Sequence, residues 1–350
     1  MCITSNEQSG NKPLISYKYL IISVGLSLLG MGVVIYLTYS PGVLEYLRLK
    51  RMPGLVIAIG VTLLRLWFAA AKIRFLAEKE ISWMASVRIM LAWDFASAVT
   101  PSTIGGAPVA TYAMSREGIK LGKSTGIILY GVLLDQFWYA LAVPILLLAG
   151  VYMAVIPPEI GFVGAATMIL IYTGLIAYGA FLTYGLLVNP ATIKNLIRWV
   201  FTLPVLRNYN EKVHEETEHL EEYSYELRAK PPRFIFKAFY LSTMAWLCRI
   251  ALPPIVILSL LPAEELILIM RSLAMNLAFL VIPTPGGSGG VEGLFAIFLG
   301  PLIDRTAFIG LAVFVWRVIT YYVSIGFGIM AMTWYVNHTV SEILPGKTDS

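Results

Sequence analysis

Six long apolar runs in the sequence dictate the class of fold. Each is long enough to cross a hydrocarbon core about 30 Å thick as a helix rising about 1.5 Å per residue. Lipid offers no hydrogen bonds to the backbone, so each run must form a helix. The chain is 58% hydrophobic and only 13% charged, against about 25% charged in soluble domains. The runs are 19–39, 55–71, 124–156, 161–188, 235–261 and 306–336.

These six runs predict an all-α, polytopic integral membrane protein with a single transmembrane domain over residues 1–350. The chain carries a net charge of +5. In a soluble protein this charge would suggest a nucleic-acid partner, but here the basic residues gather in short loops, where they report topology. We therefore expect no nucleic-acid partner.

Two further apolar segments are interrupted by residues that break helices. The second interruption, within 282–294, combines prolines with glycines and contains one acid, Glu292. Both interruptions share the pattern T-P-x-x-x-G-G, which begins at Thr100 and again at Thr284. The residues predicted to break the backbone are Thr100, Pro101, Gly105, Gly106, Pro283, Pro285, Gly286, Gly287, Gly289 and Gly290.

Such interruptions in apolar segments are typical of transport sites, because irregular backbone at membrane depth is tolerated only beside protein or a water-filled cavity. The alternative is that the glycines only allow helices to pack closely. The density of proline and glycine favours a break over a continuous helix. We therefore expect two re-entrant helical hairpins in addition to the six spans.

The charges flanking each interruption predict how the hairpins enter the membrane. Basic loops lie on both sides of the first interruption, and acidic turns flank the second, at Glu264–Glu265 and Asp304. The two hairpins are thus expected to enter from opposite sides and meet. This arrangement predicts an inverted repeat with halves at about 55–156 and 235–336, joined by the span at 161–188 and a charged connector at 189–233. Basic residues at both ends of the connector place it in the cytoplasm.

The connector contains a predicted surface helix over about 208–230. Its acidic residues alternate with Val213, Leu220 and Leu227 at heptad spacing. This pattern indicates a solvated helix with one apolar stripe. The alternative is that the helix binds a partner enzyme.

Several ionisable or polar residues lie inside the apolar segments, where a charge costs about 3 kcal/mol or more. We expect them to face the interior of the bundle. The functional interpretation is a polar chamber for a phosphate-bearing headgroup, built from the Glu292–Arg317 pair and from Asp135 with Arg88 or Arg271. The alternative is that ion pairs only hold the helices together. The candidate substrate-binding residues are Arg88, Asp94, Asp135, Arg271, Asn276, Glu292 and Arg317.

Other charges are assigned by their position along the spans. Arg249 adds a positive charge to the fifth span, whereas Arg65 and Arg74 are interpreted as interfacial side chains. The three histidines and two cysteines have no metal-ligand spacing. We expect no metal site and no cofactor.

At these residues the chain resembles the transmembrane, flippase-like domain of lysylphosphatidylglycerol synthases and its stand-alone relatives. The resemblance covers about residues 55–335 and is most specific at Pro285–Glu292, which is similar to the family pattern P-G-G-x-G-x-x-E. Arg317, Pro101, Gly105–Gly106 and Leu133-Leu134-Asp135 also match. Gln136 stands where the family usually has an arginine, and Ala107 and Ala110 replace a polar pair. These differences from the family pattern bear on which lipid headgroup the chain binds.

The resemblance implies a plasma-membrane protein that moves a lipid without synthesising it, because the chain ends at Ser350 with no room for the aminoacyl-transferase domain. The expected substrate is an anionic or aminoacylated phospholipid or a polyprenyl-phosphate-linked lipid. The alternative is a subunit or scaffold of a membrane enzyme that handles a lipid-linked substrate. The sequence contains no Walker motif, no H-x-x-E-H and no nucleophile beside a base, so we expect no enzymatic activity of its own.

Overall fold

The computed structural model describes residues 17–39, 52–101, 105–201 and 210–343. Over these ranges the protein is helical and contains no β-strand. Six segments are long and apolar enough to span a membrane, which confirms an all-α, polytopic membrane protein. These segments are Leu20–Thr38, Pro53–Leu76, Leu121–Tyr152, Pro158–Val188, Pro232–Leu260 and Ala307–His338.

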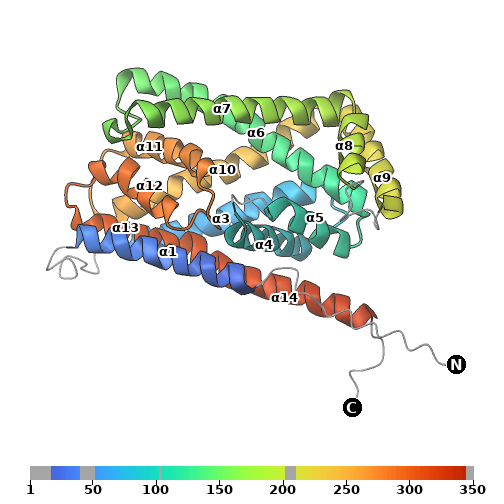
Figure 1. Ribbon diagram of the computed structural model, residues 1–350, viewed down its shortest axis with the longest axis horizontal. Helices are drawn as coiled ribbons and strands as arrows, with labels where there is room; N and C mark the ends of the chain where they lie inside the picture. The colour runs from blue at the N-terminus through green and yellow to red at the C-terminus, as the bar shows by residue number, and fades with distance from the viewer. Residues whose placement is uncertain (1–16, 40–51, 102–104, 202–209, 344–350) are drawn as a thin grey trace, which may run out of the picture.

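The long helices lie side by side in a bundle (Figure 1). Helix α7 (Gly161–Thr183) runs along one side, and α1 (Tyr17–Thr38) runs along the opposite side with α14 (Val323–Ile343). Between them, α3 (Met52–Leu76) packs along α10 (Pro232–Leu260), and α6 (Leu121–Tyr152) packs against α7. Two buried apolar clusters fill the bundle, and residues of α6 contribute to both.

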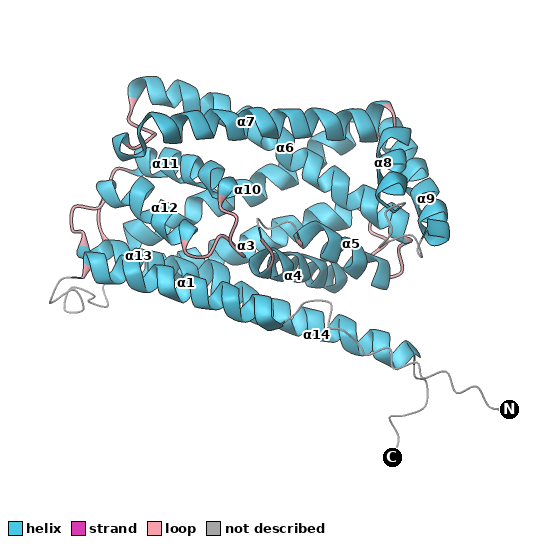
Figure 2. Ribbon diagram, viewed as in Figure 1, coloured by secondary structure: helices cyan, strands magenta, loops and turns pink. Residues whose placement is uncertain are grey.

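Both predicted interruptions are confirmed as breaks between helices. The first separates α4 (Trp83–Val99) from α5 (Gly106–Arg116). The second separates α11 (Glu265–Ala278) and its short 3-10 turn, Phe279–Val281, from α12 (Gly290–Leu299). In each hairpin the two helices pack together, and Figure 2 shows the loop that leads into α12 in the second hairpin.

The two hairpins meet at their tips. Pro101 and Pro285 form an isolated antiparallel bridge, and Gly286 N–H donates to the Thr100 carbonyl at 3.4 Å. Helices α4 and α5 lie in the half of the bundle near α8 and α9, whereas α11 and α12 lie in the other half (Figure 1). The breaks therefore converge in the interior of the bundle. The inverted relation between residues 55–156 and 235–336 stays a prediction.

Glycines at the second tip adopt backbone conformations that other residues rarely adopt. Gly286, Gly287 and Gly289 have φ values of 59°, 68° and 84°. A Cβ added to Gly286 would lie 2.5 Å from the carbonyl oxygen of Ala98 in the first hairpin. The contact between the tips thus requires glycine here for both conformation and space.

We expect Gly286→Ala to lower the free energy of unfolding by about 1–3 kcal/mol or more, because it adds left-handed strain to a clash with the opposite tip. Thermal unfolding of the detergent-purified protein measures this effect. Gly293→Ala is the matched control, since a Cβ there meets nothing within 4 Å. Equal stability of the two variants would show that the tips do not constrain each other.

Helix α1 packs across the junction of the two tips. Ser23 Oγ donates to the Ala98 carbonyl at 2.6 Å, and Gly30 is so close to Gly289 that an added Cβ would lie 2.6 Å from its Cα. Ser27 Oγ donates to Glu292 Oε1. The sequence did not predict that this helix contacts the hairpins. Helix α1 covers the junction of the two hairpin tips on one side.

The connector forms two helices, α8 (Ala191–Phe201) and α9 (Asn210–Ala229). Helix α9 packs on α6 through buried Leu220, Tyr223 and Leu227, as its apolar stripe predicts. The Tyr223 hydroxyl donates to the Leu76 carbonyl at 3.0 Å, and burial raises its pKa well above the usual range. Tyr223 is therefore a neutral donor at physiological pH.

The last span contains an irregularity that the sequence did not predict. Helix α13 (Ala307–Arg317) continues into α14 through a π-helical turn, Val318–Tyr322. Insertions of this kind are often found at functional sites. The turn begins directly after Arg317 and lies beside the hairpin tips, since Tyr321 Oη and Ser288 Oγ are 3.0 Å apart.

Candidate functional site

Two adjoining cavities lie where the hairpin tips meet α3 and α10. Their volumes are about 130 Å³ and 280 Å³. The smaller cavity is bounded by the π-helical turn and α12, and the larger extends toward α6 and α7. Six residues line both cavities: Arg65, Asp94, Ser97, Arg249, Asn276 and Phe279. We refer to the two cavities together as the chamber.

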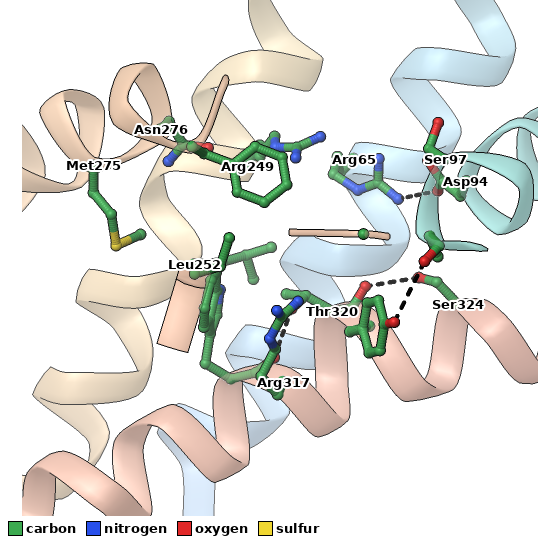
Figure 3. Close-up of a pocket in the computed structure, with 16 residues that line it drawn as sticks. Arg65, Asp94, Ser97, Arg249, Leu252, Met275, Asn276, Arg317, Thr320 and Ser324 are labelled. Carbon is green, nitrogen blue, oxygen red and sulfur yellow. Dashed lines mark hydrogen bonds and ion pairs between the residues drawn. The ribbon is translucent and has the colours of Figure 1, made fainter. Parts of the chain in front are cut away.

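Arginines from different helices surround the smaller cavity. Figure 3 shows Arg65 of α3, Arg249 of α10 and Arg317 of α13 reaching the same space. Asp94 of α4 is the acidic residue among those that line this cavity. The cavity is thus strongly basic.

Glu292 and Arg317 form a buried ion pair next to the smaller cavity, which Arg317 lines and Glu292 does not. Arg317 Nε donates to Glu292 Oε1 at 2.8 Å. The side chain of Arg317 is 5% exposed and that of Glu292 is 0% exposed. Glu292 also accepts from Ser27 and, at 2.8 Å, from Gly289 N–H. The carboxylate therefore occupies the positive end of α12. This pairing agrees with the sequence-based interpretation.

The guanidinium of Arg317 is only partly used by this pair. Arginine commonly binds a carboxylate through two parallel N–H donors. Here Nε binds Glu292, whereas the buried Nη2 finds no hydrogen-bond partner among the described residues. A buried, unpaired donor costs about 1–3 kcal/mol, and more when it is charged. Arg317 thus retains donor capacity at the cavity.

Arg249 has no acidic partner among the described residues. Its guanidinium carbon lies 5.3 Å from the ring centre of Trp246 and 5.8 Å from that of Phe279. These ring contacts orient the cation between the two cavities, both of which it lines. Since no hydrogen bond or ion pair holds it within the described chain, Arg249 is available to an anion.

Arg65 was interpreted from the sequence as interfacial, and the structure contradicts this. Its Nη2 binds Asp94 Oδ2, and the exposed side-chain fractions of Arg65 and Asp94 are 15% and 17%. Both residues line both cavities. The position of Arg65 in the middle of α3 would have been the signal for this role.

Asp135 is partnered differently from the prediction. Its Oδ1 accepts from Lys72 Nζ at 2.8 Å, from Ser242 and from Trp246 Nε1 at 3.0 Å. Asp135 lines the larger cavity together with Lys72. Lys72 directly follows the predicted span 55–71, so the sequence suggests a basic residue at the end of that span. Lys72 lies seven residues after Arg65, so both side chains are on one face of the helix. This spacing could have predicted that Lys72 faces the same interior as Arg65.

Arg88 and Arg271, predicted as partners of Asp135, lie elsewhere. Arg88 binds Glu117 with contacts of 2.8–3.1 Å and stacks on Trp334 at 3.8 Å. Arg271 donates to the carbonyls of Ala154 at 2.9 Å and Phe298 at 3.1 Å.

Neither arginine lines the chamber. The sequence pattern did not predict the partner of either arginine. Arg88 binds an acid at the end of α5, and Arg271 binds backbone carbonyls. Asn276 does line both cavities, and its Nδ2 donates to the Ser272 carbonyl at 2.9 Å.

The charges in and around the chamber do not balance. Arg65, Lys72, Arg249 and Arg317 face only three acids, Asp94, Asp135 and Glu292, each of which already binds one of the other cations. One positive charge, on Arg249, is left without a counter-ion among the described residues. The chamber is therefore suited to an anion.

The family described as the lysylphosphatidylglycerol synthase TM region matches residues 20–328. The chain belongs to this family. A UPF0104 membrane protein of Archaeoglobus fulgidus is 25% identical over 264 residues, which cover 73% of this chain and 77% of the relative.

The lysylphosphatidylglycerol synthase TM match includes both hairpins and every residue of the chamber. Within it, the pattern Pro285–Glu292 forms the second hairpin tip and the start of α12. Asp135 and its neighbour Gln136 both line the larger cavity. Gln136, at the position where the resemblance predicts an arginine, thus lies at the chamber itself.

Proposed function

We propose that this member of the lysylphosphatidylglycerol synthase TM family moves a phosphate-bearing lipid between the leaflets of the plasma membrane. The candidate substrates are an anionic or aminoacylated phospholipid and a polyprenyl-phosphate-linked lipid. One observation carries the proposal: Arg249 lies inside the bundle without an ion-pair partner among the described residues, and it lines the same cavity as Arg317, whose Nη2 is also unpaired.

A purely structural role explains the other charges but not this one. Ion pairs that hold helices together account for Arg65 with Asp94, Lys72 with Asp135 and Arg317 with Glu292. An uncompensated arginine within a membrane is costly and is retained where function requires it. A lipid phosphate provides the missing counter-charge and matches the planar guanidinium fork.

The position of the site also supports transport. In membrane transporters the substrate binds near the midplane, where discontinuous helices meet. Here both helix breaks border the smaller cavity: Ala98 precedes the first break, and Gly286 belongs to the second. A lipid headgroup held between the tips is shielded from hydrocarbon on its way across.

The 350 residues contain no Walker motif, and we propose that movement is either downhill or coupled to an ion gradient. Glu292 and Asp135 are the candidate proton carriers, and each would have to part from its cation, Arg317 or Lys72, before it could take up a proton.

A leaflet-resolved assay in proteoliposomes tests the proposal. Fluorescent phosphatidylglycerol, an aminoacylated analogue and a short polyprenyl phosphate are compared with a fluorescent diacylglycerol that has no phosphate. We expect protein-dependent movement of at least one phosphate lipid. Absence of such movement for every phosphate lipid, with and without a proton gradient, would rule out the proposed function.

A second candidate is a subunit of a membrane enzyme, with the acidic connector as the docking helix. The exposed face of α9 favours it, because Glu215, Glu222 and Glu226 are exposed and form no ion pair with another described helix. Replacing these three residues with lysine reverses the charge of that face but spares the buried stripe and the ion pairs of Glu218 with α8. A docking role predicts loss of a co-purifying enzyme, whereas a transport role predicts unchanged lipid movement.

A further inference from the structure

Helix α8 lies outside the six spans, and yet it presents large apolar side chains at the surface of the protein. Leu196 is 43% exposed and Trp199 is 63% exposed. Both side chains belong to a helix whose apolar and polar residues lie on different faces. The contacts made by the other faces of α8 determine where this exposed pair points.

Two faces of α8 are occupied by the protein itself. Ile193 is buried and Ile197 is partly buried, and both pack on the core of the bundle. Lys194 and Arg198 form ion pairs with acidic residues of α9, the shortest of which joins Lys194 Nζ to a carboxylate oxygen at 2.7 Å. The two isoleucines therefore face the bundle, and the two cations face α9.

The exposed pair lies on the side of α8 that is turned away from α9. With 3.6 residues per turn, each residue advances by about 100° around the helix. Leu196 and Trp199 are thus centred roughly 150° from Lys194 and Arg198. Asn195, which is also exposed, lies opposite the buried isoleucines. The apolar arc of α8 therefore continues from the face that is buried against the bundle to a face at the edge of the bundle.

The beginning of α8 adjoins a surface that faces lipid. Helix α7 belongs to the fourth membrane span, and α8 packs on the π-helical turn at the end of that span, Tyr184–Val188. The side chains of Tyr184 and Val188 are both about half exposed. Exposed apolar side chains on a membrane span contact lipid. The exposed face of α8 thus starts where the lipid-facing surface of α7 ends.

The orientation of α8 places it parallel to the membrane plane. Figure 1 shows α8 and α9 running across the end of the bundle, whereas the spans run along it. An amphipathic helix in this orientation lies in the interface, with its apolar face at the boundary of headgroups and acyl chains. Tryptophan is enriched at that depth because its ring is both apolar and able to donate a hydrogen bond.

We propose that α8 is a membrane-surface helix that inserts Leu196 and Trp199 into the headgroup region of the leaflet at this end of the bundle. The partner is the phospholipid surface itself, so the inference goes beyond the proposed function and does not depend on it. Through its ion pairs, α8 also holds the acidic α9 at that surface. A second copy of the chain is a poorer partner, because two side chains offer far less than the roughly 800 Å² per partner that a stable protein interface buries.

Spin labels on α8 test this inference in liposomes of phosphatidylcholine. Both cysteines of the chain, Cys2 and Cys248, are first replaced with serine. A nitroxide label is then attached to Leu196→Cys or Trp199→Cys, and its accessibility to oxygen, which concentrates in lipid, is compared with its accessibility to a water-soluble nickel chelate.

Two further label sites serve as matched controls. Asn195→Cys reports the exposed face of α8 that points away from the bundle. Leu170→Cys reports a lipid-facing position within α7, where the native side chain is 72% exposed. All four labelled side chains are exposed in the native protein, so the labels should not disturb its packing.

We expect the oxygen-to-nickel ratio at positions 196 and 199 to be several-fold higher than at 195 and to approach that at 170. The corresponding depth is about 5–10 Å into the headgroup and acyl boundary. Ratios at 196 and 199 equal to that at 195 would mean that this face points into water, which overturns the inference. Protection of both positions from both reagents, with dipolar broadening between labels, would assign the face to a second copy and overturn it as well.

Discussion

Arg317→Met is expected to destabilise the protein by about 3–5 kcal/mol, because it leaves the carboxylate of Glu292 buried without its counter-charge. Glu292 is 0% exposed and keeps only the Ser27 hydroxyl and the Gly289 N–H as donors. Glu292→Gln is expected to have a similar effect, since it strands the guanidinium instead. Thermal unfolding in detergent measures both changes.

The double variant separates the ion pair from the packing around it. Removing both charges leaves no isolated ion, so Glu292→Gln with Arg317→Met should be more stable than the sum of the single effects predicts. Arg233→Met, at an exposed arginine near the start of α10, is the control for loss of one arginine. If Arg317→Met is as stable as Arg233→Met, the pair does not hold α12 against α13.

The largest expected effect on function comes from Arg249→Met. The substitution preserves much of the side-chain volume and breaks no ion pair with a described residue, so the protein should fold with near-native stability. It removes the one positive charge of the chamber that no acid neutralises. We expect lipid movement to fall by ten-fold or more, since a charge-assisted hydrogen bond is worth about 1.5–3 kcal/mol.

Arg249→Lys refines this prediction. Lysine keeps the charge but loses the planar fork, so partial activity is expected. Initial rates for all variants are compared at equal protein incorporation, with Arg233→Met as the control. Native rates in Arg249→Met would mean that Arg249 does not contact the substrate.

Much of the fold could be predicted from the sequence, because apolar length and helix breakers act locally. The six spans follow from the lipid solvent, and the breaks follow from proline and glycine at 100–106 and 282–290. The meeting of the two hairpins was expected from flanking charge, and the structure shows that they meet at Pro101 and Pro285. The π-helical turn after Arg317 has no such local signal.

The site was predictable in its residue types but only partly in its pairings. Glu292 and Arg317 lie 25 positions apart on neighbouring short helices, and their pairing was predicted. The pairing of Asp135 with Lys72, and of Asp94 with Arg65, depends on how α3 rotates against α4 and α6, which charge patterns do not encode. Lys72 lies beyond the predicted end of its span at residue 71, although α3 continues to Leu76. The position of Arg249 within its span did not show that this arginine lacks an ion-pair partner.

The most direct test of the account is the distance between lipid phosphorus and arginine nitrogen. Solid-state NMR can measure it as dipolar dephasing between ³¹P and ¹⁵N in proteoliposomes that contain ¹⁵N-arginine protein and a lipid that the protein moves. We predict a phosphorus–nitrogen distance of about 4 Å, as expected for a phosphate bound directly to a guanidinium, with dephasing much reduced in Arg249→Met. Equal dephasing in native protein and Arg249→Met, or none in either, would contradict a phosphate site in the chamber.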